Sequence, residues 1–283
     1  MRLRSRVVCL MVPVLLLGCE EAPKQEPDRT EPWRAQPSAE VKDRLLASYS
    51  IEPRGVARFT LSAREATHQG EVRVARGKLD VDLLNLDDTR GHIDLDLGAL
   101  AVAQSVDGGT GDNHELTQQA RNWLRLGASR PSSDIDRLRW ASFRIKTVER
   151  TSSPAAHTGR KVAKLPMDAG PDATSDAGTK DAIVDARSVR LDVVGDLTIN
   201  EVRVEARVQA EAQFYYASEA SAEAKPIKIQ LKTRKAFKIG LATHDIQPRN
   251  ALGVVIAKDH DLLGIQVGKV ARVSADLAAT LRP

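Results

Sequence analysis

Apolar and charged residues alternate along most of the chain from Tyr49 to Leu281. A period of two, with one apolar face and one charged face, predicts antiparallel β-sheet that contacts water on one side. Roughly eight to ten such strands, joined mostly by short polar turns, predict a β-barrel or a β-sandwich. The alternating stretches are 49–61, 72–83, 93–97, 141–145, 189–193, 202–214, 227–239 and 271–281.

The length of the strands favours the barrel. Residues 202–214 would span roughly 40 Å at about 3.3 Å per residue, whereas strands of sandwiches usually have about five or six residues. Long strands suit a closed barrel, which leaves no sheet edge exposed. The predicted fold class is therefore all-β, an antiparallel β-barrel.

The apolar faces of these strands are small, because 202–214 carries alanine and valine and 271–281 carries alanine again. An eight-stranded barrel either fills its centre with bulky side chains or encloses a ligand there. The small faces thus predict an elongated apolar cavity. Two alternatives stay open. A helix or loop packs against the alanine-rich faces, or large residues opposite Ala206, Ala210 and Ala275 fill the barrel.

One helical segment interrupts the strands. Asp112 or Asn113 is placed to cap a helix over 115–126, and Gly127 stands where such a helix would end. This helix is a candidate plug or lid for the barrel. Its apolar face consists of Leu116, Ala120, Trp123 and Leu124.

A second interruption, residues 161–186, has no apolar period. Its centre is rich in Asp, Ala and Gly, a composition typical of a disordered loop between two strands. A calcium-binding loop at Asp168, Asp172 and Asp176 is the alternative. The spacing of these residues differs from that of an EF-hand, and no glutamate closes the loop.

The N-terminus predicts a bacterial lipoprotein. Three arginines precede the mostly apolar run 7–17, as in a secretory signal over residues 1–18. The run is too short to span a bilayer, which takes roughly 20 apolar residues. It ends in Leu16-Leu17-Gly18-Cys19, which resembles the bacterial lipobox, so acyl chains on Cys19 are predicted to anchor the protein to a membrane. An ordinary signal peptide with a chance cysteine is the alternative.

Residues 19–46 are predicted to be a tether ahead of a barrel domain over 47–283. The first part is polar and rich in proline, which predicts a flexible chain. Ser38 is placed to cap a short helix over 39–47. Glu20 after the cysteine favours the outer membrane by analogy with enteric bacteria. The predicted location is the cell envelope, at the periplasmic face of the outer membrane.

Composition narrows the function further. Of the 283 residues, 42% are hydrophobic and 28% charged, as in ordinary globular proteins. The net charge of +4 falls to +1 without Arg2, Arg4 and Arg6, so no bulk charge favours nucleic acid. The two cysteines, Cys9 and Cys19, lie in or beside the signal. A disulfide scaffold and a four-cysteine zinc site are therefore excluded.

The sequence contains no Gly-x-Ser-x-Gly, Walker-type or His-Glu-x-x-His pattern. No two of its histidines are two or four residues apart, so no local metal pair is predicted. His244-Asp245 and Asp259-His260-Asp261 place histidine beside carboxylate, and an enzymatic alternative depends on them. We predict no catalytic residue, no metal site and no cofactor. The histidines are His68, His92, His114, His157, His244 and His260.

Several short motifs follow one another along the chain. They are Tyr49-Ser50-Ile51-Glu52-Pro53, Ala57-Arg58-Phe59-Thr60-Leu61, Arg139-Trp140-Ala141-Ser142-Phe143-Arg144-Ile145 and Val194-Gly195-Asp196-Leu197-Thr198-Ile199-Asn200-Glu201-Val202. In this order they resemble the YceI-like family of periplasmic, lipocalin-like proteins over roughly residues 47–283, with 161–186 as an insertion. The resemblance implies an eight-stranded antiparallel barrel, with one short helix, that encloses a long polyisoprenoid chain.

The chain departs from the family pattern in three places. No arginine precedes Asn113-His114-Glu115-Leu116, the Pro-x-Ile-x-Phe strand is reduced to Trp140-Ala141-Ser142-Phe143, and no Arg-x-x-Phe-Gly element stands near Thr243. Within the resemblance, four phenylalanines line or end the tunnel, together with the small residues of two strands. The predicted lining is Phe59, Phe143, Val204, Ala206, Val208, Ala210, Phe214, Phe237 and Ala275.

The leading hypothesis is an envelope lipoprotein that binds or carries an isoprenoid-like or other long-chain lipid inside its barrel, without catalysis. Burial of hydrocarbon, worth about 0.8 kcal/mol per methylene, would supply the binding energy. The predicted partners are this lipid and, through Cys19, a membrane. One alternative is a surface-anchored interaction module with a filled barrel. Another is an enzyme in which His114, His244 and His260 converge in one cleft.

Overall fold

The computed structural model describes residues 45–283 except 64–66, 74, 107–108, 113, 152–160, 166–181, 218–223, 257–259 and 263–264. The predicted signal peptide, Cys19 and nearly all of the tether lie outside the described residues. Leu46 and Ala47 were expected to end a short helix, but they begin strand β1 (Leu46–Ile51). Residues 43–283 form a compact unit of their own.

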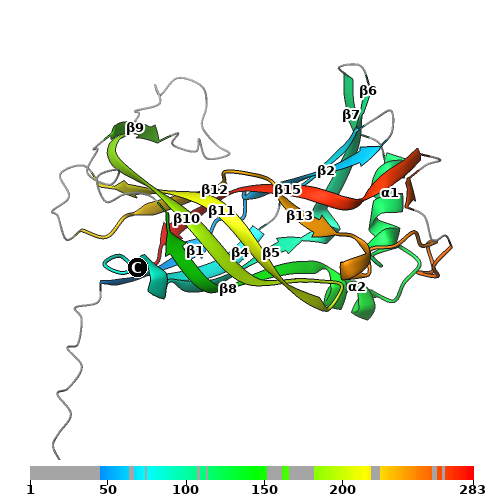
Figure 1. Cartoon of the computed structure of the whole chain (residues 1–283), viewed down its shortest axis with the longest axis horizontal. Helices are drawn as coiled ribbons and strands as arrows, with labels where there is room; N and C mark the ends of the chain where they lie inside the picture. Colours follow the sequence, from blue (N-terminus) through cyan, green and yellow to red (C-terminus); the bar gives the residue numbers. More distant parts are fainter. Residues whose placement is uncertain are drawn as a thin grey trace, which may run out of the picture. The chain divides into compact units, whose positions relative to one another are not determined.

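The predicted all-β barrel is confirmed. Eight strands are joined edge to edge in the order β1-β4-β5-β8-β10-β11-β12-β15, and β15 pairs with β1 to close the ring (Figure 1). All these pairings are antiparallel. Besides β1, the strands of the ring are β4 (Ala75–Asp82), β5 (Arg90–Asp96), β8 (Trp140–Arg150), β10 (Ala182–Ile199), β11 (Val202–Tyr216), β12 (Lys228–Thr233) and β15 (Ile265–Leu281).

Several walls of the barrel are long strands with a break. β1 and β2 pair one after the other with β15, and β12 and β13 do the same on its other side. Pro53 lies in the break between β1 and β2, where its missing N–H costs no ladder bond. The barrel therefore extends past the closed ring. The strands of this extension are β2 (Val56–Ala63), β3 (Thr67–Val72), β6 (Leu100–Val106), β7 (Gly109–Asp112) and β13 (Phe237–Gly240).

Helix α1 (His114–Trp123) lies along strand β6. Strand β5, which comes just before β6 in the chain, pairs with β8 of the ring. The Val102 N–H donates to Thr117 Oγ1 at 2.9 Å, and the Arg121 guanidinium donates to the Leu100 carbonyl at 3.0 Å. These contacts satisfy backbone groups on an edge of β6 that would otherwise lack partners. The helix therefore covers this end of the barrel, as the expected plug or lid (Figure 1).

Two details of the helical region differ from the prediction. α1 ends at Trp123, and the left-handed residue that follows it is Arg125, with a φ of 63°, two residues before Gly127. The Leu126 N–H donates to the Arg121 carbonyl at 2.8 Å, as in a Schellman cap. A second helix, α2 (Ser132–Leu138), follows where one short helix was expected. Seven residues are too few to show a helical period in the sequence.

Both ends of the predicted disordered insertion are strands. Its two ends, β9 (Lys161–Leu165) and the beginning of β10, form an antiparallel pair. Backbone N–H and C=O groups make such a ladder whatever the side chains are, so composition alone did not reveal it. The rest of the insertion, 166–181, lies outside the described residues.

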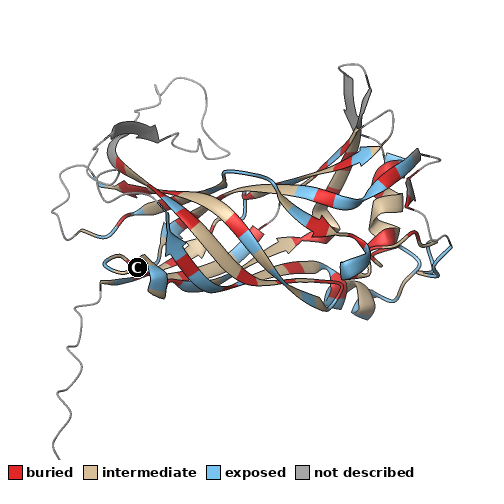
Figure 2. Cartoon of the chain, in the orientation of Figure 1, coloured by how far each residue is buried: buried red, intermediate tan, exposed pale blue. Residues whose placement is uncertain are grey.

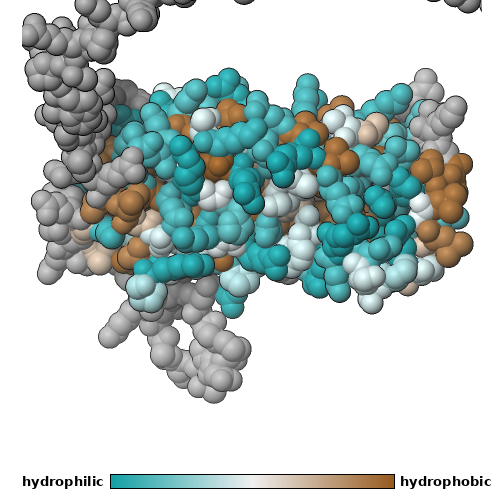
Figure 3. Space-filling model, turned by 90° about the horizontal axis from the view of Figure 1, so that it is seen from below, coloured by the Kyte–Doolittle hydropathy of each residue, from teal (hydrophilic) through white to brown (hydrophobic). Residues whose placement is uncertain are grey.

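Buried and exposed residues alternate along the strands, as the period of two predicted (Figure 2). The outer surface in Figure 3 is largely hydrophilic, and hydrophobic side chains gather at the end that carries the loop before β14 (Asp261–Leu262). Apolar side chains of the walls therefore face the inside. The exposed aliphatic residues of the loop are Leu252, Val254, Val255 and Ile256.

Candidate functional site

Two apolar chambers, each of about 150 Å³, lie inside the barrel. They share part of their walls, so they adjoin, and we call the two chambers together the tunnel. The shared residues come from six strands and encircle the tunnel at its middle. We call them the collar: Ala57, Leu95, Ala141, Leu197, Phe237 and Val273.

The first chamber lies within the closed ring of strands. Alternate residues of each strand reach it, for example Phe143 and Ile145 of β8 and Leu191 and Val193 of β10. The polar lining residues are Thr89, Lys232 and Thr233, and all other lining side chains are apolar. Such a surface attracts hydrocarbon and offers few hydrogen bonds to a polar ligand.

The second chamber lies at the helical end. Trp123 and Leu124, from α1 and the residue after it, form part of its wall. Ile246 and Leu262 add to this wall from the loop after η4 (Ala242–His244) and from β14. The chamber is therefore closed by the helix and by the loops that pack beside it.

Seven of the nine predicted lining residues border the tunnel. Phe143, Val208, Ala210, Phe214 and Ala275 line the first chamber, Phe59 lines the second, and Phe237 lines both. Val204 and Ala206 line neither chamber, which corrects their predicted position. They follow the β10–β11 turn, where η4 packs against β11, and Ala206 packs against the buried cluster there. Ligand contact by any of these residues stays a prediction.

Two phenylalanines of the tunnel wall lie over glycines. A Cβ atom added at Gly70 would overlap the Phe59 ring, and one added at Gly195 would overlap the Arg144 carbonyl and the Phe143 ring. Each ring therefore occupies the space that a side chain at the glycine would need. The sequence singled out Gly195 as part of a motif, and the structure supplies its reason.

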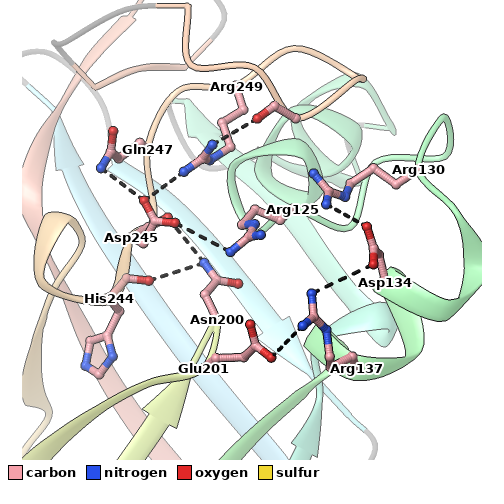
Figure 4. Close-up of polar contacts among 11 residues, drawn as sticks. Arg125, Arg130, Asp134, Arg137, Asn200, Glu201, His244, Asp245, Gln247 and Arg249 are labelled. Carbon is pink, nitrogen blue, oxygen red and sulfur yellow. Dashed lines mark hydrogen bonds and ion pairs between the residues drawn. The ribbon is translucent and has the colours of Figure 1, made fainter.

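Ion pairs fasten the loops over the second chamber (Figure 4). Asp245 accepts a hydrogen bond from Arg249 at 2.7 Å and lies 3.7 Å from Arg125, just after α1. Arg137 of α2 pairs with Glu201 of the β10–β11 turn at 3.1 Å. The loop after η4, both helices and this turn are thus held together as one cap.

The structure does not gather the three histidines of the enzymatic alternative around one reactive group. His114 is exposed at the start of α1. The buried ring of His244 approaches the Val202 carbonyl at 3.2 Å, and that of His260 approaches the Ile246 carbonyl at 3.0 Å. Figure 4 shows the Asp245 carboxylate directed at arginines, away from the His244 ring.

Within the described ranges, no group of three or more His, Cys, Asp or Glu side chains is arranged to hold a metal ion. The described helices are also too short or too polar for any of them to cross a bilayer.

Stability is expected to fall as the pH drops below about 6.5, the usual pKa of histidine in an unfolded chain. Burial lowers the pKa of His68 and of His244 in the folded protein. Below pH 6.5 the unfolded chain therefore binds protons that the folded chain does not, and the free energy of unfolding decreases. Urea unfolding at pH 7.5 and pH 5 measures this loss.

The His68→Leu variant should lose less stability between these two pH values than the wild-type protein. His92→Leu is the matched control, because His92 is exposed on β5. An unchanged pH dependence in His68→Leu would show that His68 does not contribute.

No protein-family model matches the chain, and no curated protein sequence matches it significantly. Several solved structures resemble it, among them the following two. One is a polyisoprenoid binding domain from Saccharophagus degradans implicated in plant cell wall breakdown, with a TM-score of 0.46 and 13% identity over 83% of this chain and 99% of that one. The other is Burkholderia cenocepacia BcnA, with a TM-score of 0.45 and 10% identity over 81% and 99%. We therefore argue the function from the tunnel itself.

Proposed function

We propose that this protein binds one long-chain lipid inside its barrel and makes or breaks no bond in it. The observation that carries the proposal is the tunnel. Two adjoining apolar chambers lie inside a barrel, and the outer face that Figure 3 shows is largely hydrophilic. Small residues of the walls, such as Ala210 and Ala275, border open space rather than opposing large side chains.

Hydrocarbon burial supplies enough free energy for this binding. At about 0.8 kcal/mol per methylene, ten methylenes contribute roughly 8 kcal/mol before the cost of ordering the chain. A narrow, elongated tunnel favours a single linear chain over a compact ligand. An isoprenoid-like or acyl lipid has this shape, and the motif resemblance supports the isoprenoid class.

The proposed setting is the bacterial cell envelope. The apolar run before Cys19 supports export, and acyl chains on Cys19 would hold the protein at the periplasmic face of the outer membrane. A lipid carrier in this position takes its ligand from one membrane surface and shields it from water.

Native mass spectrometry of residues 20–283, exported to a bacterial periplasm and purified without detergent, tests the proposal. We expect a stoichiometric adduct that organic extraction identifies as a prenyl or acyl lipid. An empty protein that also ignores added hydrophobic probes would contradict lipid binding and favour the interaction module.

A further inference from the structure

Trp123 lines the second chamber, and its ring nitrogen is one of four buried ring nitrogens of the described residues that have no hydrogen-bond partner. They are Nε1 of Trp123, Nδ1 of His260 and both nitrogens of His68. The three side chains are 2%, 4% and 0% exposed, so water does not reach them from outside. Buried polar atoms are nearly always paired in folded proteins, and unpaired ones need a specific explanation. A bound ligand is such an explanation when the atoms border a cavity.

The Trp123 and His260 nitrogens belong to one place. Trp123 lines the second chamber at its capped end, and the two rings meet edge to face with centroids 5.6 Å apart. The Ile246 carbonyl, 3.0 Å from His260 Nε2, can only accept a hydrogen bond, so Nε2 carries the hydrogen. In the neutral ring Nδ1 is then an acceptor. A free donor and a free acceptor thus belong to two rings that are in contact.

The chamber offers no counter-charge to a charged ligand. Among the described lining residues, Arg58 is the charged one, and it is exposed between the inward-facing Ala57 and Phe59 of β2. Burial also lowers the pKa of His68, which keeps that ring uncharged at pH 7. A phosphate or carboxylate in this chamber would therefore be buried without a cation, which is strongly unfavourable.

We propose that Trp123 and His260 bind the uncharged polar end of the lipid, a primary alcohol. Its hydroxyl accepts a hydrogen bond from Trp123 Nε1 and donates one to His260 Nδ1, while the chain passes the collar into the first chamber. This assignment rests on the proposed lipid binding and adds the orientation and the head group of the ligand.

A comparison of three ligands tests the assignment on the exported chain. The probes are geranylgeraniol, the same hydrocarbon without its hydroxyl, and geranylgeranyl diphosphate, each competing with a fluorescent apolar dye. We expect the alcohol to bind about tenfold more tightly than the hydrocarbon, the size expected of one or two buried hydrogen bonds. The diphosphate should bind most weakly.

Trp123→Phe removes the N–H and keeps most of the apolar ring. It should abolish the preference for the alcohol, so that the alcohol and the hydrocarbon bind this variant with equal affinity. Trp140→Phe is the matched control, because Trp140, the first residue of β8, lies on the outer wall of the barrel. There the Arg76 guanidinium is 3.6 Å from the centroid of the Trp140 ring. This control should keep the preference for the alcohol.

The indole N–H resonances of the wild-type protein give a second readout that needs no variant to fold. The alcohol should move the Trp123 resonance downfield, and the hydrocarbon should not. Equal affinities for alcohol and hydrocarbon, with an unmoved Trp123 resonance, would overturn this assignment and leave lipid binding intact. Tightest binding of the diphosphate would also overturn it. Failure of all three ligands to bind would instead overturn the proposed function.

Discussion

Phenylalanine in place of Ala141 is expected to lower the affinity for a twenty-carbon lipid by at least about 100-fold. Ala141 is 5% exposed and belongs to the collar, so the larger ring would fall between the two chambers. A chain that cannot pass the collar loses the burial of several methylenes. Four of them, at about 0.8 kcal/mol each, already correspond to more than 100-fold.

A series of alcohols of increasing length, each displacing a fluorescent apolar dye, measures this effect. A ten-carbon alcohol needs one chamber, so its affinity should stay within about threefold of the wild-type value. Ala57→Phe should act in the same way from β2, across the barrel, in case Ala141→Phe overpacks its site.

Ala101→Phe is the matched control, because Ala101 lies between the inward-facing Leu100 and Val102 of β6 and faces outward. A wild-type affinity for the twenty-carbon alcohol in both collar variants would contradict a single continuous tunnel.

Leucine in place of Arg139 is expected to lower the melting temperature by roughly 6–12 °C. Asp96, whose side chain is 3% exposed, accepts hydrogen bonds from the Gly98 N–H at 2.9 Å and from Arg139 Nε at 2.7 Å. The Leu97 N–H also donates to the Arg139 carbonyl at 2.8 Å. These bonds hold the bend between β5 and β6. Without Arg139, the Asp96 carboxylate is left buried and unpaired.

The loss should depend on pH. Burial by itself raises the pKa of Asp96, but the hydrogen bonds from Arg139 and Gly98 outweigh it and hold the pKa below its usual value. A lowered carboxyl pKa stabilises the fold above about pH 4, and this contribution disappears as the pH falls through the folded pKa. The melting temperatures of wild type and variant should therefore converge as the pH approaches 3.

Two further variants separate the buried charge from simple loss of an arginine. Arg76→Leu removes a guanidinium that pairs with Asp94 at 3.2 Å on the exposed side of Trp140, and should shift the melting temperature by less than about 2 °C. The double variant Asp96→Asn with Arg139→Leu should recover part of the loss, since no charge stays buried. Equal losses in Arg139→Leu and Arg76→Leu would contradict a role for the buried pair.

The sequence predicted the walls of this barrel well because the period of two is local. Whether a residue faces inward depends on its position within its own strand, so Phe143, Ala210 and Ala275 were assigned to the lining that they occupy. Helix α1 was predicted for the same reason, and its Leu116 and Trp123 are buried as expected.

The cap and the polar end of the tunnel depend on contacts between distant segments, which no local pattern encodes. The Asp96–Arg139 pair spans 43 positions, and His260 meets Trp123 from a different loop. η4 and the β10–β11 turn cover the part of β11 that carries Val204 and Ala206. The alternation of apolar and charged residues therefore extends along β11 beyond the end of the cavity.

The sequence by itself determined the strands of the closed ring and most of their inward faces, since each follows from the order of neighbouring side chains. Only the tertiary structure decided the closure of β1 on β15, the division of the tunnel by a collar and the unpaired nitrogens at its capped end. Closure and capping join backbone groups and side chains that lie far apart in the chain. Their partners are selected by the packing of the whole barrel.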